Sequence, residues 1–374
     1  MPEYKSQHYV PKCYLKNFTN NEMLFSVYNH KTEKFIDNVT YKTQCQKDYF
    51  YNPEWEEKLN KIETKWGKIF KKINCEDNLS IDEVKLLKIF SIYQYLRTKV
   101  EYNHSFEIEK ESFREYYRMD CLSKKTPYTD SEFNASWDLL DKYSSPVEHL
   151  NNAEEFENEI DDLDLLIITY NTNTRLISSD SPVIMLNPFC KNVGFKTIGL
   201  VIFFAVSPDK LVVFYDSKIY SEFKNVLYFI SYDEKEVKAL NNIQYIMSED
   251  IIYGINSNYF NYVKGLKSKR EQQQSKAKIN SLGSDTNKII HQVPRQVSYD
   301  YNFSFAKFSS KLKEIPWQCR DALPREWSAE YEKRVRVILP NIPDIMNNYN
   351  SKDKKILKKG YEKMAKFALK YWGK

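Results

Sequence analysis

The stretch Asp164-Leu165-Leu166-Ile167-Ile168-Thr169-Tyr170 marks a change in the character of the sequence. Its continuous apolar run is typical of a buried β-strand. Asn171-Thr172-Asn173 then predicts a turn, and Arg175-Leu176-Ile177-Ser178 predicts the returning strand of a hairpin. A sheet is therefore expected to begin at residue 164, and the elements on either side of it decide the fold class.

Helical patterns dominate the sequence before this point. A strand-turn-strand hairpin is expected over residues 24–36, and a loop ends at Pro53, which suits the first position of a helix. Ser80 with Glu83 three residues later forms a capping-box pattern at the start of a helix. Apolar residues at helical spacing predict helices over 54–73, 80–102, 106–118 and 131–140.

The sequence after the first strands supplies more sheet and then more helix. Residues 199–206 and 211–215 predict a strand pair around Ser207-Pro208-Asp209, and a helical pattern resumes over 234–246. Helices, a small sheet and helices again favour the α+β class, helix-rich with a small and mainly antiparallel sheet. This order argues against a doubly wound α/β sheet.

A polar stretch divides the chain into three parts. Residues 268–287 have low apolar content, which is typical of a flexible loop or linker. We therefore expect a main α+β domain over residues 1–267, a linker or loop over 268–295 and a helical C-terminal appendage over 296–374. The apolar core of the appendage would be marginal alone, so we expect it to dock on the main domain.

Composition limits the compartment and the partners. Of 374 residues, 42% are hydrophobic, and 56 basic against 51 acidic residues give a net charge of +5, which permits nucleic-acid contact without being evidence for it. Six scattered cysteines and five histidines form no zinc-ligand pairs, so reduced thiols in a cytoplasmic protein are expected. We expect no signal peptide and no membrane partner, because the apolar stretches are too short to span a bilayer.

Glu63 and Arg97 are charged residues on the apolar faces of two successive predicted helices. Glu63 lies in a row with Leu59 and Trp66, so its carboxylate needs a partner, and Arg97 is the natural candidate. We favour a buried Glu63–Arg97 ion pair that ties the helices together. The alternative is that Arg97 or Gln94, three residues apart on one flank, faces a carboxylate or phosphate ligand.

Asp180 lies in a short polar turn where a strand is expected to end, before Ser181-Pro182. An Asx-type turn, in which Asp180 caps local backbone groups, is the simpler interpretation. A catalytic or ligand-binding role is the alternative, because polar loops at strand ends often carry sites.

His8 belongs to the stretch Ser6-Gln7-His8-Tyr9-Val10-Pro11-Lys12-Cys13-Tyr14-Leu15-Lys16-Asn17-Phe18. The rigid Val10-Pro11 and the apolar residues after it predict a segment docked in the fold. A histidine held there is a candidate general acid or base near neutral pH, although hydrogen-bonded packing is the commoner role.

The sequence lacks the motifs of several well-known enzyme classes. It contains no Gly-rich phosphate loop, no Gly-x-Ser-x-Gly elbow and no His-Glu-x-x-His, which argues against nucleotide-hydrolase, esterase and zinc-protease functions. The lysine-rich residues 351–374 are most simply an amphipathic surface helix, with nucleic-acid binding as the alternative.

Four separated pieces of the sequence are distinctive in combination. They are His8 to Phe18, Asp48-Tyr49-Phe50-Tyr51, Gln94-Tyr95-Leu96-Arg97-Thr98, and Ser179-Asp180-Ser181-Pro182-Val183 followed by Ser207-Pro208. In this order they resemble a family of uncharacterised bacterial proteins that begin His-Tyr-Val-Pro. The resemblance covers residues 6–260 and implies members among defence or mobile-element genes, but it supplies no established catalytic residues.

Two classes of function are therefore expected. The first is an antiviral-defence or toxin-type nuclease that hydrolyses phosphodiester bonds, with nucleic acid or a partner protein from the same operon as its partner. It depends on His8, Glu63, Gln94, Arg97 and Asp180, the polar residues of otherwise apolar segments. His8 would be the acid or base, Arg97 the phosphate clamp, and Asp180 would orient His8 or hold Mg²⁺. The second is a non-catalytic ligand-binding, sensor or interaction module.

Overall fold

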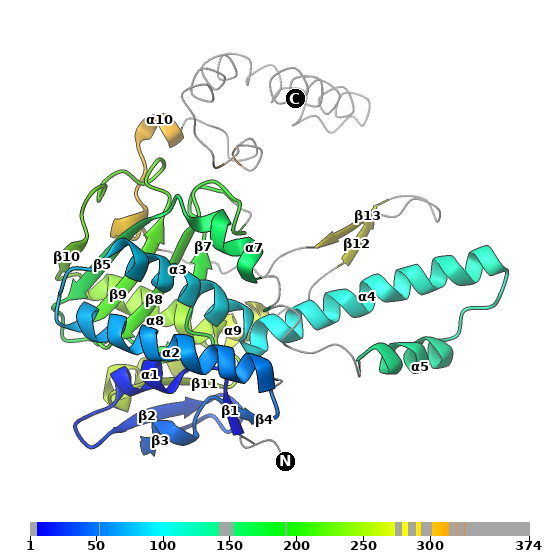
Figure 1. The fold of residues 1–374 in the computed structure, drawn as a ribbon, viewed down its shortest axis with the longest axis horizontal. Coiled ribbons are helices and arrows are strands. Elements are labelled where there is room, and N and C mark those ends of the chain that lie inside the picture. Colours follow the sequence, from blue (N-terminus) through cyan, green and yellow to red (C-terminus); the bar gives the residue numbers. More distant parts are fainter. Residues whose placement is uncertain are drawn as a thin grey trace.

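Two small sheets and the helices around them make up the fold (Figure 1). The structure is a computed structural model that describes residues 6–51, 53–141, 153–190, 193–273, 279–282, 289–292 and 301–313, together with residues 150, 320 and 325. Helices and small, mainly antiparallel sheets follow one another along the chain, which confirms the α+β class.

The larger sheet has five strands in the order β10-β5-β9-β8-β7. They are β5 (Asp164–Tyr170), β7 (Ile184–Leu186), β8 (Val201–Ser207), β9 (Lys210–Tyr215) and β10 (Tyr228–Ser231). Only the β10–β5 pair of this sheet is parallel. Every residue of β8 and β9 is buried, which explains their continuous apolar sequences and confirms the predicted strand pair.

The predicted hairpin partner of β5 is wrong. β5 pairs with β9 and β10. Of the expected returning strand only Ser178 lies in a strand, β6 (Ser178–Ser179), which pairs with β11 (Ile251–Gly254) of the other sheet. The chain between β5 and β6 crosses between the sheets. Its backbone N–H groups find separate acceptors outside a regular strand pair. Leu176 N–H donates to the Pro208 carbonyl oxygen, and Ile177 N–H donates to the Asn241 side chain.

The smaller sheet is antiparallel and has the order β3-β2-β11-β6. Its strands are β2 (Leu24–Asn29), β3 (Lys34–Thr40), β6 (Ser178–Ser179) and β11 (Ile251–Gly254), so the hairpin expected over residues 24–36 is confirmed. Two further ribbons pair β1 (Ser6–His8) with β4 (Gln46–Asp48), and β12 (Ile279–Leu282) with β13 (Ile289–Gln292).

Two helices cover the larger sheet. The α2 helix (Pro53–Asn74) and the α3 helix (Ile81–Leu96) pack against each other and against β8, in front of the sheet in Figure 1. Phe90 of α3 lies 5.0 Å from Phe204 of β8, measured between ring centroids. Ser80 and Glu83 form the predicted capping box at the start of α3.

The helix predicted over residues 80–102 is broken near its end. α3 stops at Leu96, and α4 (Lys99–Lys124) starts three residues later. Thr98 Oγ1 donates to the Tyr95 carbonyl oxygen, a side-chain bond that competes with helical pairing. Beyond the break, α4 and α5 (Asp130–Asp141) form a hairpin that projects from the sheets (Figure 1).

The remaining elements are short apart from α8. They are α1 (Lys12–Leu15), α7 (Ala153–Glu157), α8 (Glu234–Met247), α9 (Lys267–Gln273), α10 (Ser310–Lys313), and the 3-10 helices η1 (Lys16–Phe18), η2 (Tyr41–Thr43), η3 (Asn158–Ile160), η4 (Ser257–Tyr259), η5 (Asn261–Leu266) and η6 (Ser304–Ala306). In the part of the chain that the structure describes, no helix is both long and apolar enough to cross a membrane.

The region after residue 267 contributes to the main core. Phe303 and Phe305 are buried against Phe203 of β8, and Ser304 donates two hydrogen bonds to the buried Glu236 carboxylate of α8. Within the predicted linker the structure has α9 and the β12–β13 ribbon. The division at residues 267 and 295 stays a prediction, since most of the expected appendage lies outside the described residues.

Candidate functional site

The N-terminal segment is embedded in the fold, as its apolar residues predict. Gln7 is buried and exchanges two hydrogen bonds with the Tyr51 backbone, which extends the β1–β4 pairing. Tyr14 is fully buried, and its hydroxyl lies 3.0 Å from Ser178 Oγ and donates to the Ala205 carbonyl oxygen at 2.5 Å. The segment therefore contacts strands of both sheets.

Arg97 is the centre of a buried polar network next to this segment. Its side chain is 1% exposed, and its Nε and Nη2 atoms donate to Gln94 Oε1 at 2.9 and 2.8 Å. Gln94 Nε2 in turn donates to the Tyr9 carbonyl oxygen at 3.0 Å. The amide of Gln94 thus joins the guanidinium of Arg97 to the backbone of the N-terminal segment.

The predicted Glu63–Arg97 ion pair is confirmed. Arg97 Nη1 lies 2.9 Å from Glu63 Oε1 and links the end of α3 to α2. Burial raises the pKa of the Glu63 carboxyl, and the positive charge of Arg97 acts against that rise. The ion pair neutralises the buried charge of Arg97 and the partly buried charge of Glu63, as an inward-facing carboxylate requires.

His8 points its imidazole at a backbone group. Nε2 lies 3.0 Å from the Lys42 carbonyl oxygen, and because a carbonyl only accepts, this nitrogen carries the proton and donates. Burial, followed by the charge of Lys12, lowers the pKa of His8 to about 4, although the bond to Lys42 acts in the opposite direction. The imidazole is therefore neutral at pH 7.

Asp180 is buried where β6 ends, and it binds another part of the chain. Its two carboxylate oxygens accept the backbone N–H groups of Glu249, Asp250 and Ile251 at 3.0, 2.6 and 3.2 Å. The expected Asx-type turn is wrong, because Asp180 does not cap local backbone groups. The local N–H of Ser181 donates instead to Ser179 Oγ. Burial raises the pKa of Asp180 to about 6, against these hydrogen bonds.

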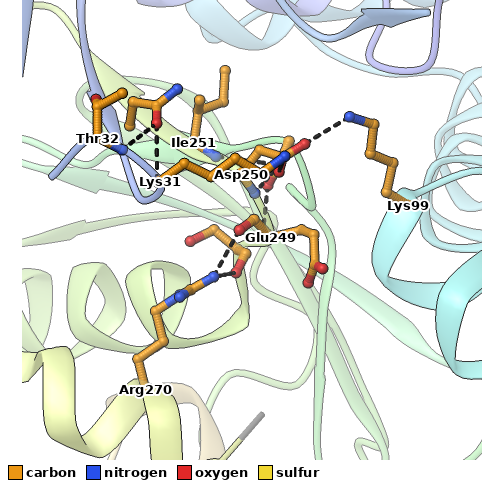
Figure 2. A network of polar contacts seen from close by, with 10 residues as sticks. Lys31, Thr32, Lys99, Glu249, Asp250, Ile251 and Arg270 are labelled. Atoms are coloured by element: carbon orange, nitrogen blue, oxygen red, sulfur yellow. Dashed lines mark hydrogen bonds and ion pairs between the residues drawn. The ribbon is translucent and has the colours of Figure 1, made fainter. Parts of the chain in front are cut away.

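Side chains from other elements also bind the turn at residues 248–251 that Asp180 holds (Figure 2). Asp250 forms ion pairs with Lys31 of the β2–β3 hairpin at 3.1 Å and with Lys99 of α4 at 2.6 Å. Arg270 of α9 donates to the carbonyl oxygens of Ser248 and Glu249 at 3.0 and 2.7 Å. Three elements distant in sequence therefore hold the residues that precede β11.

Tyr9 lies between the network around Arg97 and the turn that Asp180 holds. Gln94 binds the Tyr9 carbonyl oxygen and joins it to Arg97, which pairs with Glu63. Lys99, the partner of Asp250, lies 5.3 Å over the Tyr9 ring. Every candidate has polar atoms bound to protein groups. No cluster of three or more His, Cys, Asp or Glu side chains suited to a metal ion occurs in the described residues.

Sequence reasoning missed Tyr9, Lys99, Asp250 and Arg270 as members of the network. One signal for Asp250 was present, because Ser248-Glu249-Asp250 is a polar turn directly before the apolar β11. Lys99 and Arg270 look like ordinary surface cations in the sequence. Only the folded chain shows that they meet the same turn.

Three of the four distinctive pieces of sequence contact one another around the N-terminal segment, and the fourth begins directly after a residue that binds it. Tyr9 packs on Phe50, Gln94 binds the Tyr9 backbone, and Ser178 binds Tyr14 beside the Asp180 turn. Comparisons with curated proteins and with solved structures find no significant match. A family model described as "Protein of unknown function (DUF4238)" matches residues 6–258. Because the match covers well over half of the sequence, the chain belongs to this family.

Proposed function

We propose that this protein is a non-catalytic ligand-binding or interaction module, and that its buried polar network is a scaffold. The observation that carries the proposal is that other protein groups already form hydrogen bonds with the candidate catalytic side chains. Arg97 donates to Gln94 and Glu63, and Asp180 accepts three backbone N–H groups. Groups bound in this way stabilise a fold strongly, because leaving any of them unpaired is costly.

The chemistry of phosphodiester cleavage asks for different properties. A phosphate clamp needs guanidinium donors that a ligand can reach, and Arg97 is 1% exposed. A general acid or base works best with a pKa near the working pH, whereas burial lowers the pKa of His8 to about 4. Both observations favour the scaffold over the nuclease that is expected from the sequence.

The test is a cleavage assay with matched variants. Purified full-length protein is incubated with tRNA, single-stranded RNA and plasmid DNA, with and without Mg²⁺. We expect no cleavage above background, and we expect His8→Ala and Asp180→Asn to lower the melting temperature without changing any activity. Cleavage that disappears in both variants while their circular dichroism spectra stay native would overturn the proposal in favour of the nuclease.

Two finer points belong to the same proposal. We take the His-Tyr-Val-Pro segment at residues 8–11 to be a signature of the family, because Tyr9 contacts two of the other distinctive pieces through Gln94 and Phe50. We also place the protein in the cytoplasm. The described cysteines, Cys13, Cys45, Cys75, Cys121 and Cys190, are all free thiols, which suits a reducing compartment.

A further inference from the structure

An open hollow of about 550 Å³ lies where the ends of the two sheets meet. Its size is in the range of small-molecule sites. Loops from several separate parts of the chain line it: Asn20 before β2, Arg175 between β5 and β6, Pro208 and Asp209 in the β8–β9 turn, and Ile255, Asn256 and Tyr259 after β11. Loops converging at strand ends are a common setting for binding sites.

Arg175 is the main charged group of this hollow. Its side chain is half-buried, and its guanidinium forms no ion pair or hydrogen bond with the residues that the structure describes. Asp209 lines the same hollow without pairing with it, and one oxygen of its carboxylate accepts from Ser207 Oγ at 2.7 Å. Arg175 thus keeps its five N–H donors for a ligand.

Two asparagines add donors in fixed orientations. Asn20 Oδ1 accepts the N–H groups of Glu22 and Leu24, both at 3.0 Å, and Asn256 Oδ1 accepts the N–H of Asn258 at 2.9 Å. Because the amide oxygens are occupied, the amide nitrogens are the groups left to bind a ligand, and within the described part of the chain neither has an acceptor. The hollow is therefore rich in donors.

We propose that this hollow binds a small anion whose phosphate or carboxylate is held by Arg175 and by the amide nitrogens of Asn20 and Asn256. The carboxylate of Asp209 only accepts hydrogen bonds, so it would bind a hydroxyl or amino group elsewhere on the same ligand. Tyr259, which is 36% exposed, provides an aromatic wall. This inference rests on the proposed binding function and names its site and its class of ligand.

Isothermal titration calorimetry on the full-length protein at low salt tests the site. The probes are glycerol 3-phosphate and glycerate, which carry hydroxyl groups beside a phosphate or a carboxylate, and neutral glycerol is the control. We expect one of the two anions to bind with a dissociation constant of about 1 mM or tighter, and the stronger of the two identifies the anionic group. No binding of either anion would overturn the proposal.

Two variants attribute the binding to the hollow. Arg175→Gln removes the cation, and Asn256→Asp keeps the oxygen that accepts from Asn258 while adding a negative charge. Each should weaken binding about tenfold or more, the effect of losing one charge-assisted hydrogen bond. The control is Arg118→Gln, which removes a positive charge from the projecting α4–α5 hairpin and should leave binding unchanged.

The outcomes separate this site from the proposed function. Equal binding by wild type and by both hollow variants would place the anion elsewhere and overturn the proposed site. Nucleic-acid cleavage that depends on His8 and Asp180 would overturn the proposed function, but it would leave the calorimetric result for Arg175 as it stands.

Discussion

Removing the charge of Glu63 should destabilise the protein strongly. The variant Glu63→Gln keeps the size of the side chain but leaves the buried Arg97 without the carboxylate 2.9 Å away. Breaking a buried ion pair by removing one partner costs about 3–5 kcal/mol. Glu63 keeps 19% of its side chain exposed, and Gln94 still accepts from Arg97, so we expect a value near the lower limit, about 3 kcal/mol.

A double-mutant cycle isolates the pair. Arg97→Met removes the cation and the two hydrogen bonds that Arg97 donates to Gln94, so we expect it to cost about 3–5 kcal/mol as well. The double variant should cost less than the sum of the single variants, with a coupling free energy of about 2 kcal/mol. Urea unfolding at pH 7, followed by both circular dichroism and tryptophan fluorescence, measures each free energy of unfolding.

The same substitution at Glu57 is the matched control. Glu57 lies on the same helix and pairs with Lys61 at the surface, where both side chains are at least 70% exposed. We expect Glu57→Gln to leave the unfolding transition unchanged within error. The reasoning is refuted if Glu63→Gln unfolds like this control, or if the effects of Glu63→Gln and Arg97→Met are additive.

Three other predictions concern pH and the C-terminal contact. The folded pKa of Asp180, about 6, lies above its ordinary value of 3.8, so the contribution of Asp180 to stability should fall as the pH rises from 3.8 to about 6. The melting temperature of Asp180→Asn should therefore depend less on pH in this range than that of the wild type. His30 has the opposite sign, since burial lowers its pKa to about 3 from 6.5, so stability should fall as the pH drops below 6.5, and less steeply in His30→Gln. Phe305→Ala should cost about 3–5 kcal/mol in urea unfolding of the full chain, because Phe305 is 2% exposed and packs on Phe203; a cost below about 1 kcal/mol would show that its segment adds little to the core.

The sequence predicted the features that depend on local pattern and on the cost of burial. The apolar run of β5 and the spacing of α2 gave elements of the right type, because a buried strand and an amphipathic helix have distinct periods. The Glu63–Arg97 pair followed from the same logic, since a carboxylate on an apolar helix face requires a cation nearby.

The features that failed depend on partners far away in the chain. Asp180 binds backbone groups about 70 residues later, and β5 pairs with β9 and not with the segment that follows it. No local signal distinguishes these partners from nearer ones. The hollow around Arg175 was invisible for the same reason, because its lining comes from loops between residues 20 and 259 that only the fold assembles.

The position of Tyr14 has a consequence for the way the protein is made. Its hydroxyl binds Ser178 and Ala205, 164 and 191 residues later, so the segment around Tyr14 cannot complete its contacts until 191 further residues have been synthesised. At roughly 5–20 residues per second, the nascent segment waits about 10–40 s with its aromatic side chains unburied. The segment around Tyr14 thus depends on partners that are made much later, and the interval is a period when chaperones can bind it.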